Sequence, residues 1–374
     1  MINVFSPNIR LSDIISVSKN LFKTYISGTS PVVKEFEKNF AKYIGKKYAV
    51  SVSNGSVALD LALQSLNLEE GDEVIIPSFT IISCLSAVMR TPAKPVFCDV
   101  DEYSWNTNLE HIEKIITSKT KAIILVHTYG LAAEVHKIKE LCNKKDIFLI
   151  EDSAEAHGQS INGKMCGSFG DISTFSFYAN KHVTTGEGGI ILTDSKVFYD
   201  TLIQMRNLDF DNSKRFIHNN LYWNYRLSGL QASLGISQLK KITLTIKQKI
   251  NQAKIYNELL SSFEEIIQLP LENNKFSTNH YWVYGIVLKN KNIRNDLIAY
   301  LSSKGIETRP FFYPLHLQPA LGGKYQNSKC KVSEDLGENG LYLPLGSRIN
   351  KKKQKFIVEN LLNGIRHITA KEEN

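Results

Sequence analysis

One lysine, Lys181, stands where it could act as a nucleophile. It follows an apolar and aromatic run, residues 172–178, that is typical of a short buried strand, and it precedes a Gly-Glu-Gly-Gly turn at residues 186–189. Such a turn lets the backbone reverse and pack closely beside the lysine. Loss of solvent favours the neutral amine, which can form a Schiff base with an aldehyde. The competing interpretation is an ordinary exposed loop lysine, because lysines are seldom fully buried.

Polar residues also follow other predicted strands. Ser53-Asn54-Gly55-Ser56 comes after the first strand and opens a helix over residues 57–65, so its free backbone N–H groups could bind a phosphate. The same residues are also an ordinary helix cap. Glu151 and Asp152 follow the fifth strand, where a carboxylate could cap a helix or face a cationic nitrogen of a ligand. Ser176 lies near the end of the sixth strand.

The elements that must position these groups alternate between short apolar runs and helical stretches. Several of the runs are almost continuously apolar, as strands covered by helices on both faces should be. Seven strands are predicted, at residues 48–52, 73–76, 95–100, 122–126, 147–150, 172–177 and 190–193. This pattern predicts an α/β fold with a largely parallel sheet, which binds ligands beyond the carboxyl ends of its strands. A helix over residues 31–44 precedes the first strand and is stopped by Gly45.

The sequence changes character after a long helix predicted over residues 227–262. We therefore divide the chain into a large α/β domain, residues 1–245, and a smaller α+β domain, residues 246–374. Further elements are predicted on both sides of this boundary: a helix at 195–206, a charged loop at 209–220, strands at 280–288 and 306–309, helices at 293–304 and 354–365, and a long loop at 310–321.

The composition is that of an ordinary soluble globular protein. Hydrophobic residues make up 43% and charged residues 22% of the 374, which excludes a disordered or fibrous chain. The net charge of +8 suits anionic small ligands. The one dense basic run, at residues 351–355, is interpreted as a solvated face, so we expect no nucleic-acid partner.

The cysteines and the apolar stretches bear on the compartment. The five cysteines form no Cys-x-x-Cys pair and have no metal-binding spacing with histidine, so we expect reduced, packed thiols and no metal. The amino terminus lacks an apolar run of the signal-peptide type. The longest uncharged stretch, residues 74–89, is interrupted by Pro77 and is too short to cross a bilayer. We therefore expect a cytoplasmic protein that is not anchored to a membrane.

Six segments, taken in order, resemble the DegT/DnrJ/EryC1/StrS family of sugar aminotransferases. They are SNGSVALDLAL, GDEVIIPSFT, VHTYG, IEDSAEAHG, FSFYANKHVTTGEGG and NYRLSGLQASLG, and the resemblance covers practically the whole chain. It implies a fold-type-I, aspartate-aminotransferase-like protein with a seven-stranded, mostly parallel sheet and a smaller C-terminal domain. It also implies a homodimer that uses pyridoxal 5′-phosphate (PLP) to aminate a keto sugar attached to a nucleotide.

The resemblance assigns roles to particular residues. Lys181 matches the lysine that forms the Schiff base, and Asp152 matches the carboxylate that keeps the pyridine nitrogen protonated. Ser56 and the backbone at Val57 match the phosphate-binding turn, and Ser176 matches a second phosphate ligand.

Three more positions depend on the same resemblance. Asn224 matches an asparagine that reaches the phosphate from the partner subunit, so each active site would need two chains. Glu155 stands where many relatives have a glutamine near the cofactor's 3′-oxygen, and a carboxylate there would repel a phenolate unless one of them holds a proton. Ile81 stands where many relatives stack an aromatic ring on the cofactor; an aliphatic side chain can pack on the pyridine face with less specific geometry.

The substrate is suggested by two longer segments. Residues 206–226 and 305–316 resemble the branch of the family that aminates C4 of a nucleotide-linked 4-keto-6-deoxyhexose, as in the conversion of GDP-4-keto-6-deoxymannose to GDP-perosamine for surface polysaccharides such as lipopolysaccharide O-antigen. L-Glutamate is the implied amino donor. Arg309 could contact the nucleotide phosphates, and His182 or His316 could face the sugar. Each of these could equally be a structural residue.

Two alternatives stay open. The first is a PLP-dependent sugar dehydratase or deoxygenase. The sugar 3-dehydratases of the family replace the lysine with histidine, whereas Lys181 is present here with His182 after it, which favours full transamination. The second is a regulator that binds the cofactor or a sugar without catalysis, and such a protein would not need Lys181.

Overall fold

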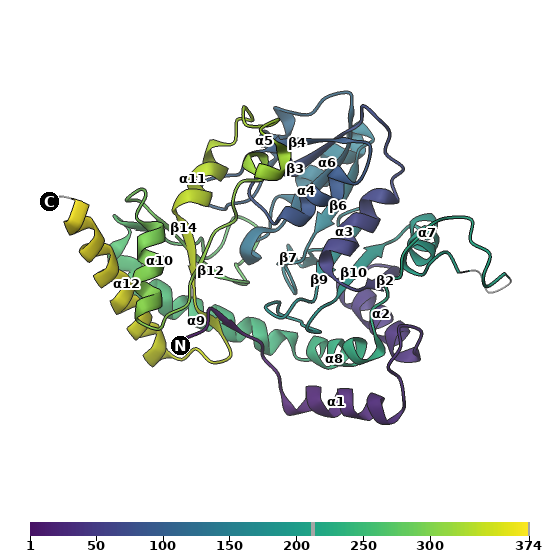
Figure 1. The fold of residues 1–374 in the computed structure, drawn as a ribbon, viewed down its shortest axis with the longest axis horizontal. Helices are drawn as coiled ribbons and strands as arrows, with labels where there is room; N and C mark the ends of the chain where they lie inside the picture. The colour runs from purple at the N-terminus through teal and green to yellow at the C-terminus, as the bar shows by residue number, and fades with distance from the viewer. Residues whose placement is uncertain (211–213, 373–374) are drawn as a thin grey trace.

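A seven-stranded sheet forms the core of the larger part of the structure (Figure 1). The structure is a computed structural model and describes residues 1–210 and 214–372. The strand order is β2-β10-β9-β6-β5-β3-β4, and only β10 runs antiparallel to its neighbours, which confirms the predicted α/β fold. The strands are Tyr48–Val52 (β2), Glu73–Pro77 (β3), Lys94–Cys98 (β4), Thr120–Val126 (β5), Phe148–Asp152 (β6), Ile172–Ser176 (β9) and Gly189–Thr193 (β10).

Helices cover both faces of this sheet, which explains why successive residues of its strands are apolar. In β5, Ile124 packs in the cluster formed with α3, α4 and α7, whereas its neighbour Ile123 packs in the cluster formed with α5 and α6. The helices of this part are α1 (Leu11–Phe22), α2 (Pro31–Ile44), α3 (Gly55–Gln64), α4 (Ile82–Met89), α5 (Leu109–Glu113), α6 (Val135–Lys145) and α7 (Lys196–Arg206). A small hairpin, β7 (Ser160–Ile161) and β8 (Lys164–Met165), follows β6.

The carboxyl ends of β2, β6 and β9 meet at one edge of the sheet, because these strands are parallel to one another. The loop after β2 leads into α3, β6 ends at Asp152, and β9 ends at Ser176. The three groups that the sequence places after strands are therefore brought to the same edge, as expected for an open α/β sheet.

An aromatic cluster fixes the end of β9. Phe40 of α2 contacts Phe175 and Phe177 edge to face, with ring centroids 5.0 and 5.1 Å apart, and Phe36 contacts Phe177 at 5.2 Å. All four rings are buried. Lys181 follows Phe177 by four residues, so this packing sets the position of the backbone that leads into the lysine.

The rest of the chain forms a second sheet of four strands, in the order β11-β12-β14-β13. The N-terminal segment packs there too, since β1 (Phe5–Ser6) pairs with β15 (Leu345–Gly346); Figure 1 shows the N-terminus beside these late elements. The elements are β11 (Ile267–Gln268), β12 (Tyr284–Leu288), β13 (Arg309–Pro310), β14 (Gly340–Leu343), α10 (Arg294–Ser303), α11 (Lys331–Asn339) and α12 (Lys351–Glu372). The domain boundary that we predict at residues 245 and 246 falls inside α9 (Ile242–Leu260) and stays a prediction.

One long helix predicted over residues 227–262 is wrong. The segment forms two helices, α8 (Gly229–Leu239) and α9, which are separated at Lys241 (φ −116°, ψ 9°). The Lys241 N–H donates to Gln238 O at 3.0 Å, a tight turn that ends α8. No glycine or proline marks this break, and the helical spacing of apolar residues continues across it, so the sequence predicts one helix.

Other predicted boundaries also differ. The strand predicted from residue 280 begins only at Tyr284, because Tyr281 has a positive φ of 50° and the Trp282 N–H donates to Tyr129 O instead of to the sheet. The strand predicted at 306–309 is reduced to Arg309–Pro310, and the final helix extends beyond 354–365 at both ends. In the charged loop predicted at 209–220, residues 211–213 lie outside the described residues.

Two further properties concern the described part of the chain. None of its helices combines the length and the apolar character needed to span a membrane. All five cysteines are buried and free of disulfide bonds.

We expect Phe40→Ala to lower the free energy of unfolding by about 3–5 kcal/mol, because it empties the space between α2 and β9. The half-exposed Phe356 is the matched control, and Phe356→Ala should change stability by under about 1 kcal/mol. Urea unfolding of the two variants measures both values, and equal losses would contradict the assigned role of the cluster.

Candidate active site

A cavity of about 510 Å³ opens at the carboxyl edge of the central sheet. Its wall combines the first turn of α3, the start of α4, the ends of β6 and β9, and the turn that carries Lys181. Trp282, Arg309 and Tyr342 close it from the side of the second sheet. The volume suits a small-molecule ligand.

Lys181 lines this cavity, and only 9% of its side chain is exposed. Its Nζ lies 3.8 Å from Glu155 Oε1 and 3.6 Å from the centroid of the Trp282 ring. Burial lowers the pKa of Lys181, and the carboxylates of Glu155 and Asp152 oppose this shift. The amine is therefore more easily deprotonated than a lysine in water, which is the condition for attack on an aldehyde.

Asp152 lies in the same cavity at the end of β6. Its Oδ1 accepts a hydrogen bond from the Ala154 N–H at 3.0 Å, and its Oδ2 accepts one from the thiol of Cys84 at 3.6 Å. Burial raises the pKa of this carboxyl, opposed by the Ala154 N–H and by Lys181. A cationic ring nitrogen placed against it would supply the opposite charge that the buried carboxylate otherwise lacks.

The first turn of α3 faces the cavity with small residues. The Val57 N–H is already taken by Asn54 Oδ1 at 2.9 Å, which leaves the N–H groups of Gly55 and Ser56 as those without an intrahelical partner. A side chain at Gly55 could not be accommodated, because its Cβ would lie 2.7 Å from Cβ of Ser176. The Ser56 hydroxyl is hydrogen bonded to Ser83 at 2.7 Å. This arrangement suits a phosphate at a helix amino terminus.

Glu155 is the second carboxylate of the cavity. Its Oε2 accepts the Tyr129 N–H at 2.8 Å, and burial raises its pKa to about 7, opposed by Lys181. A carboxyl that holds a proton near neutral pH can donate to a phenolate oxygen, which removes the repulsion expected from the sequence. Ile81, at the N-cap of α4, also lines the cavity and is 41% exposed.

Three residues named from the sequence do not line the cavity of a single chain. Asn224 is exposed and lies outside it. His182 is buried, and burial, Lys249 and the neighbouring histidines lower its pKa well below the usual range. His316 is buried, with its Nδ1 2.6 Å from Ser78 Oγ and its Nε2 3.3 Å from Glu334 Oε1. Of the residues predicted to bind substrate, only Arg309 reaches the cavity.

Sequence reasoning did not assign several aromatic residues of the wall, among them Trp282, Phe312 and Tyr342. The Trp282 ring lies against the lysine amine, but the run HYWVYGIVL is typical of a strand and does not indicate a position for this ring. Tyr342 lies in β14 and lines the cavity beside Arg309. Trp282 precedes β12, so only the packing of this later part of the chain against the central sheet could have revealed these residues.

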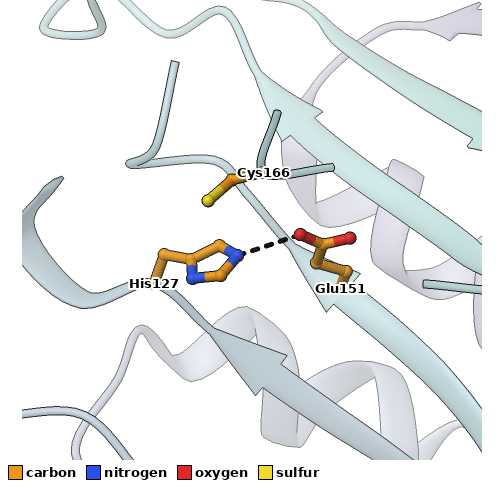
Figure 2. Close-up of side chains that lie close together, drawn as sticks. All are labelled: His127, Glu151 and Cys166. Carbon is orange, nitrogen blue, oxygen red and sulfur yellow. Dashed lines mark hydrogen bonds and ion pairs between the residues drawn. The ribbon is translucent and has the colours of Figure 1, made fainter. Parts of the chain in front are cut away.

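A buried cluster of His127, Glu151 and Cys166 lies beside the site (Figure 2). His127 Nε2 is 3.0 Å from Glu151 Oε1, while its Nδ1 accepts the Ala133 N–H at 3.0 Å. Glu151 also accepts the N–H groups of Gly167, Phe169 and Gly170 at 2.5 to 2.9 Å. Because these lone pairs are already in use and burial raises the pKa of the Cys166 thiol, we interpret the cluster as a structural tie between β6 and the loop at 167–170.

The site and the fold together fit PLP. The amine of Lys181 could bind the aldehyde of that group, and the carboxylate of Asp152 could face its ring nitrogen. The turn of small residues at Gly55 leaves room for its phosphate. Such a site on a mostly parallel seven-stranded sheet defines a PLP-dependent aminotransferase of fold type I.

The comparisons with known proteins agree with this class. Residues 12–362 match the DegT/DnrJ/EryC1/StrS aminotransferase family, and the chain belongs to it. It is 38% identical over 360 residues to GDP-perosamine synthase from Escherichia coli O157:H7. The matched region covers 96% of this chain and 97% of that protein.

Solved structures share the fold over nearly the full length. The aminotransferase TlmJ from Streptoalloteichus hindustanus superposes with a TM-score of 0.92 at 27% identity, covering 99% of this chain and 100% of that one. A GDP-4-keto-6-deoxymannose-3-dehydratase with bound GDP-perosamine superposes with a TM-score of 0.88 at 26% identity, covering 96% and 100%.

We expect Glu155→Gln to change how the stability of the cofactor-free protein depends on pH. The raised pKa means that the folded protein keeps a proton that the unfolded chain releases near 4.5, so this group's contribution to stability is complete below pH 4.5 and is lost as pH rises through about 7. Glutamine makes no such contribution, so the urea midpoint of the variant should rise relative to that of the wild type between pH 4.5 and pH 7, while the buried histidines act alike in both proteins. The exposed Glu359→Gln is the control, and a wild-type slope in Glu155→Gln would contradict the assignment.

Proposed function

We propose that this aminotransferase converts a nucleotide-linked 4-keto-6-deoxyhexose, such as GDP-4-keto-6-deoxymannose, to the 4-amino sugar with L-glutamate as donor. The observation that carries the transamination is the buried Lys181 amine, which shares one cavity with Asp152. The choice of sugar is supported by the similarity to GDP-perosamine synthase over almost the whole chain. Kinetics should be ping-pong, because both substrates react in the same cavity in turn.

Five residues of the cavity would have defined tasks in this reaction. When bound, PLP supplies an aldehyde carbon and a ring that accepts electrons. Lys181 would hold the aldehyde and, as a free amine, would carry a proton between the substrate Cα and the cofactor C4′. Asp152 would keep the ring nitrogen protonated, the turn at Gly55 and Ser56 would hold the phosphate, and protonated Glu155 would donate to the 3′-oxygen.

A dehydratase is the second candidate, favoured by the similarity to the GDP-4-keto-6-deoxymannose-3-dehydratase structure. In a dehydratase of this kind, no lysine carries the proton that completes transamination. The dehydratase branch of the family has a histidine in place of that lysine. Lys181 is present here and its amine faces the cavity, which supports transamination. A non-catalytic regulator would have no use for the desolvated amine.

Incubation of the protein with PLP, glutamate and a panel of GDP-, UDP- and dTDP-linked 4-keto sugars should yield an amino sugar, identified by mass. Lys181→Ala should lower the rate by at least about a thousandfold, since it removes both the covalent link and the proton carrier. The exposed Lys196→Ala is the control. Loss of oxygen from the sugar without gain of nitrogen would favour the dehydratase, and unchanged biological function of Lys181→Ala would favour the regulator.

We also propose a homodimer in which Asn224 completes the phosphate site of the partner. Support comes from the segment before it, whose apolar side chains are strongly exposed: Phe216 by 79%, Leu221 by 98% and Trp223 by 68%. Apolar surface of this extent is typical of a protein interface.

The buried thiols, which form no disulfide bonds, suit a reducing compartment. This supports a cytoplasmic reaction in the synthesis of surface polysaccharide such as O-antigen.

A complementation experiment tests the shared site. Lys181→Ala and Asn224→Ala should each be impaired alone, whereas co-expressed chains that form mixed dimers should regain activity, because one of their two sites then has both residues intact. The control combines Lys181→Ala with Lys181→Gln, which cannot complement. Activity that does not recover in isolated mixed dimers would place Asn224 in its own chain's site or in none.

A further inference from the structure

A second buried lysine, Lys249, lies behind the first. It belongs to α9, is 8% exposed, and donates from Nζ to the carbonyl oxygen of Trp282 at 2.7 Å. Among the described residues it forms no ion pair with a carboxylate within 4 Å. A buried ammonium group that has only a carbonyl as partner is costly to keep, so a role beyond stability has to account for it.

Lys249 is connected to Lys181 in two ways. The residue whose carbonyl it binds, Trp282, is also the one whose ring lies 3.6 Å from Lys181 Nζ. Both lysines also line a second, small cavity of about 20 Å³ on the side of Asn180 and Gln248. The backbone of Trp282 is held at its other end, since its N–H donates to Tyr129 O at 3.0 Å. The backbone that carries this ring is therefore held at both its N–H and its carbonyl group.

The charges around Lys181 come from two sides. Asp152 and Glu155 face it from the end of β6 and the turn that follows, and both favour its protonated form. On the other side, burial lowers the pKa values of the histidines, so they are neutral at pH 7; they are His157, His182 and His280. Two cations can offset the carboxylates: Arg309, which lines the cavity from β13, and Lys249, which lies on the side of the second, small cavity. Burial, together with Lys181, lowers the pKa of Lys249 to about 7.

We propose that Lys249 is a positioning residue of the active site, which fixes Trp282 beneath Lys181 and presents a second ammonium group that favours the neutral amine of Lys181. The proposal rests on the proposed function in one respect, namely that Lys181 carries the cofactor. The same pairing of two nearby amines activates lysine nucleophiles in general, because each disfavours the charged form of the other. Here it would keep the catalytic amine reactive although two carboxylates share its cavity.

The test uses the spectrum of the PLP-bound enzyme and not its activity. The absorbance of the cofactor bound to Lys181 is followed against pH in wild type, Lys249→Met and Lys249→Arg. Removing the nearby cation in Lys249→Met should raise the pH midpoint by roughly one unit, whereas Lys249→Arg, which keeps the charge, should stay near the wild-type value. Lys254→Met, an exposed lysine on the same helix, is the control.

A second readout separates geometry from charge. Lys249→Gln can still donate to the Trp282 carbonyl but carries no charge, so it should shift the midpoint as Lys249→Met does. Rebinding of PLP to the cofactor-free protein at neutral pH should be slower in both neutral variants, because more of the Lys181 amine is protonated. If Lys249→Met destabilises the fold, Lys249→Gln carries the same test.

The outcomes distinguish the possibilities. A midpoint that is unchanged in folded Lys249→Met and Lys249→Gln would overturn the proposal and leave Lys249 a purely structural residue. A shift in Lys249→Arg as large as that in Lys249→Met would also overturn it, since charge would then not be the cause. Borohydride reduction followed by peptide mapping checks the premise, and a label on a lysine other than Lys181 would instead refute the proposed function.

Discussion

The active site depends on the removal of water from one amine. Lys181 is held between a carboxylate and an indole ring, in a cavity that the central sheet closes from one side and the second sheet from the other. In bulk water its ammonium form would be strongly favoured, and only a small fraction of the amine would be free to attack an aldehyde at neutral pH. The fold makes the amine a nucleophile by packing around it, and most of the chain contributes to that packing.

The two sheets contribute different parts of this environment. The central sheet brings together the groups that bind a cofactor, because three of its parallel strands end at the same edge with α3, Asp152 and Ser176. The second sheet supplies the aromatic wall and, through α9, the buried Lys249. The N-terminal strand β1 joins this second group by pairing with β15. This pairing joins residues that are 340 positions apart in the chain, Phe5 and Leu345.

The sequence predicts the central sheet well because helices cover both of its faces, so most residues of its strands are buried and apolar. The same reasoning fails where local pattern and tertiary contact disagree. Trp282 reads as part of a strand, yet Tyr281 adopts a positive φ and the backbone of Trp282 bonds to the turn at Tyr129. The break at Lys241 has no glycine or proline to announce it. His182 and His316 follow recognisable motifs, but their side chains pack into the core, and only coordinates distinguish that from facing a ligand.

Burial also explains how so many ionisable groups can share one small region. A buried group without an opposite charge adopts its neutral form, because the loss of hydration penalises only the charged form. The pKa of Glu155 rises, those of His157 and His182 fall, and that of Lys181 falls, so each of these groups moves toward neutrality. The pKa of Asp152 rises as well, and a protonated ring nitrogen would be the partner that lets this carboxyl keep its charge. Lys249 follows the same trend, but with a pKa of about 7 it keeps part of its charge at neutral pH, and it lines the same small cavity as Lys181, so that charge can act on the reacting amine.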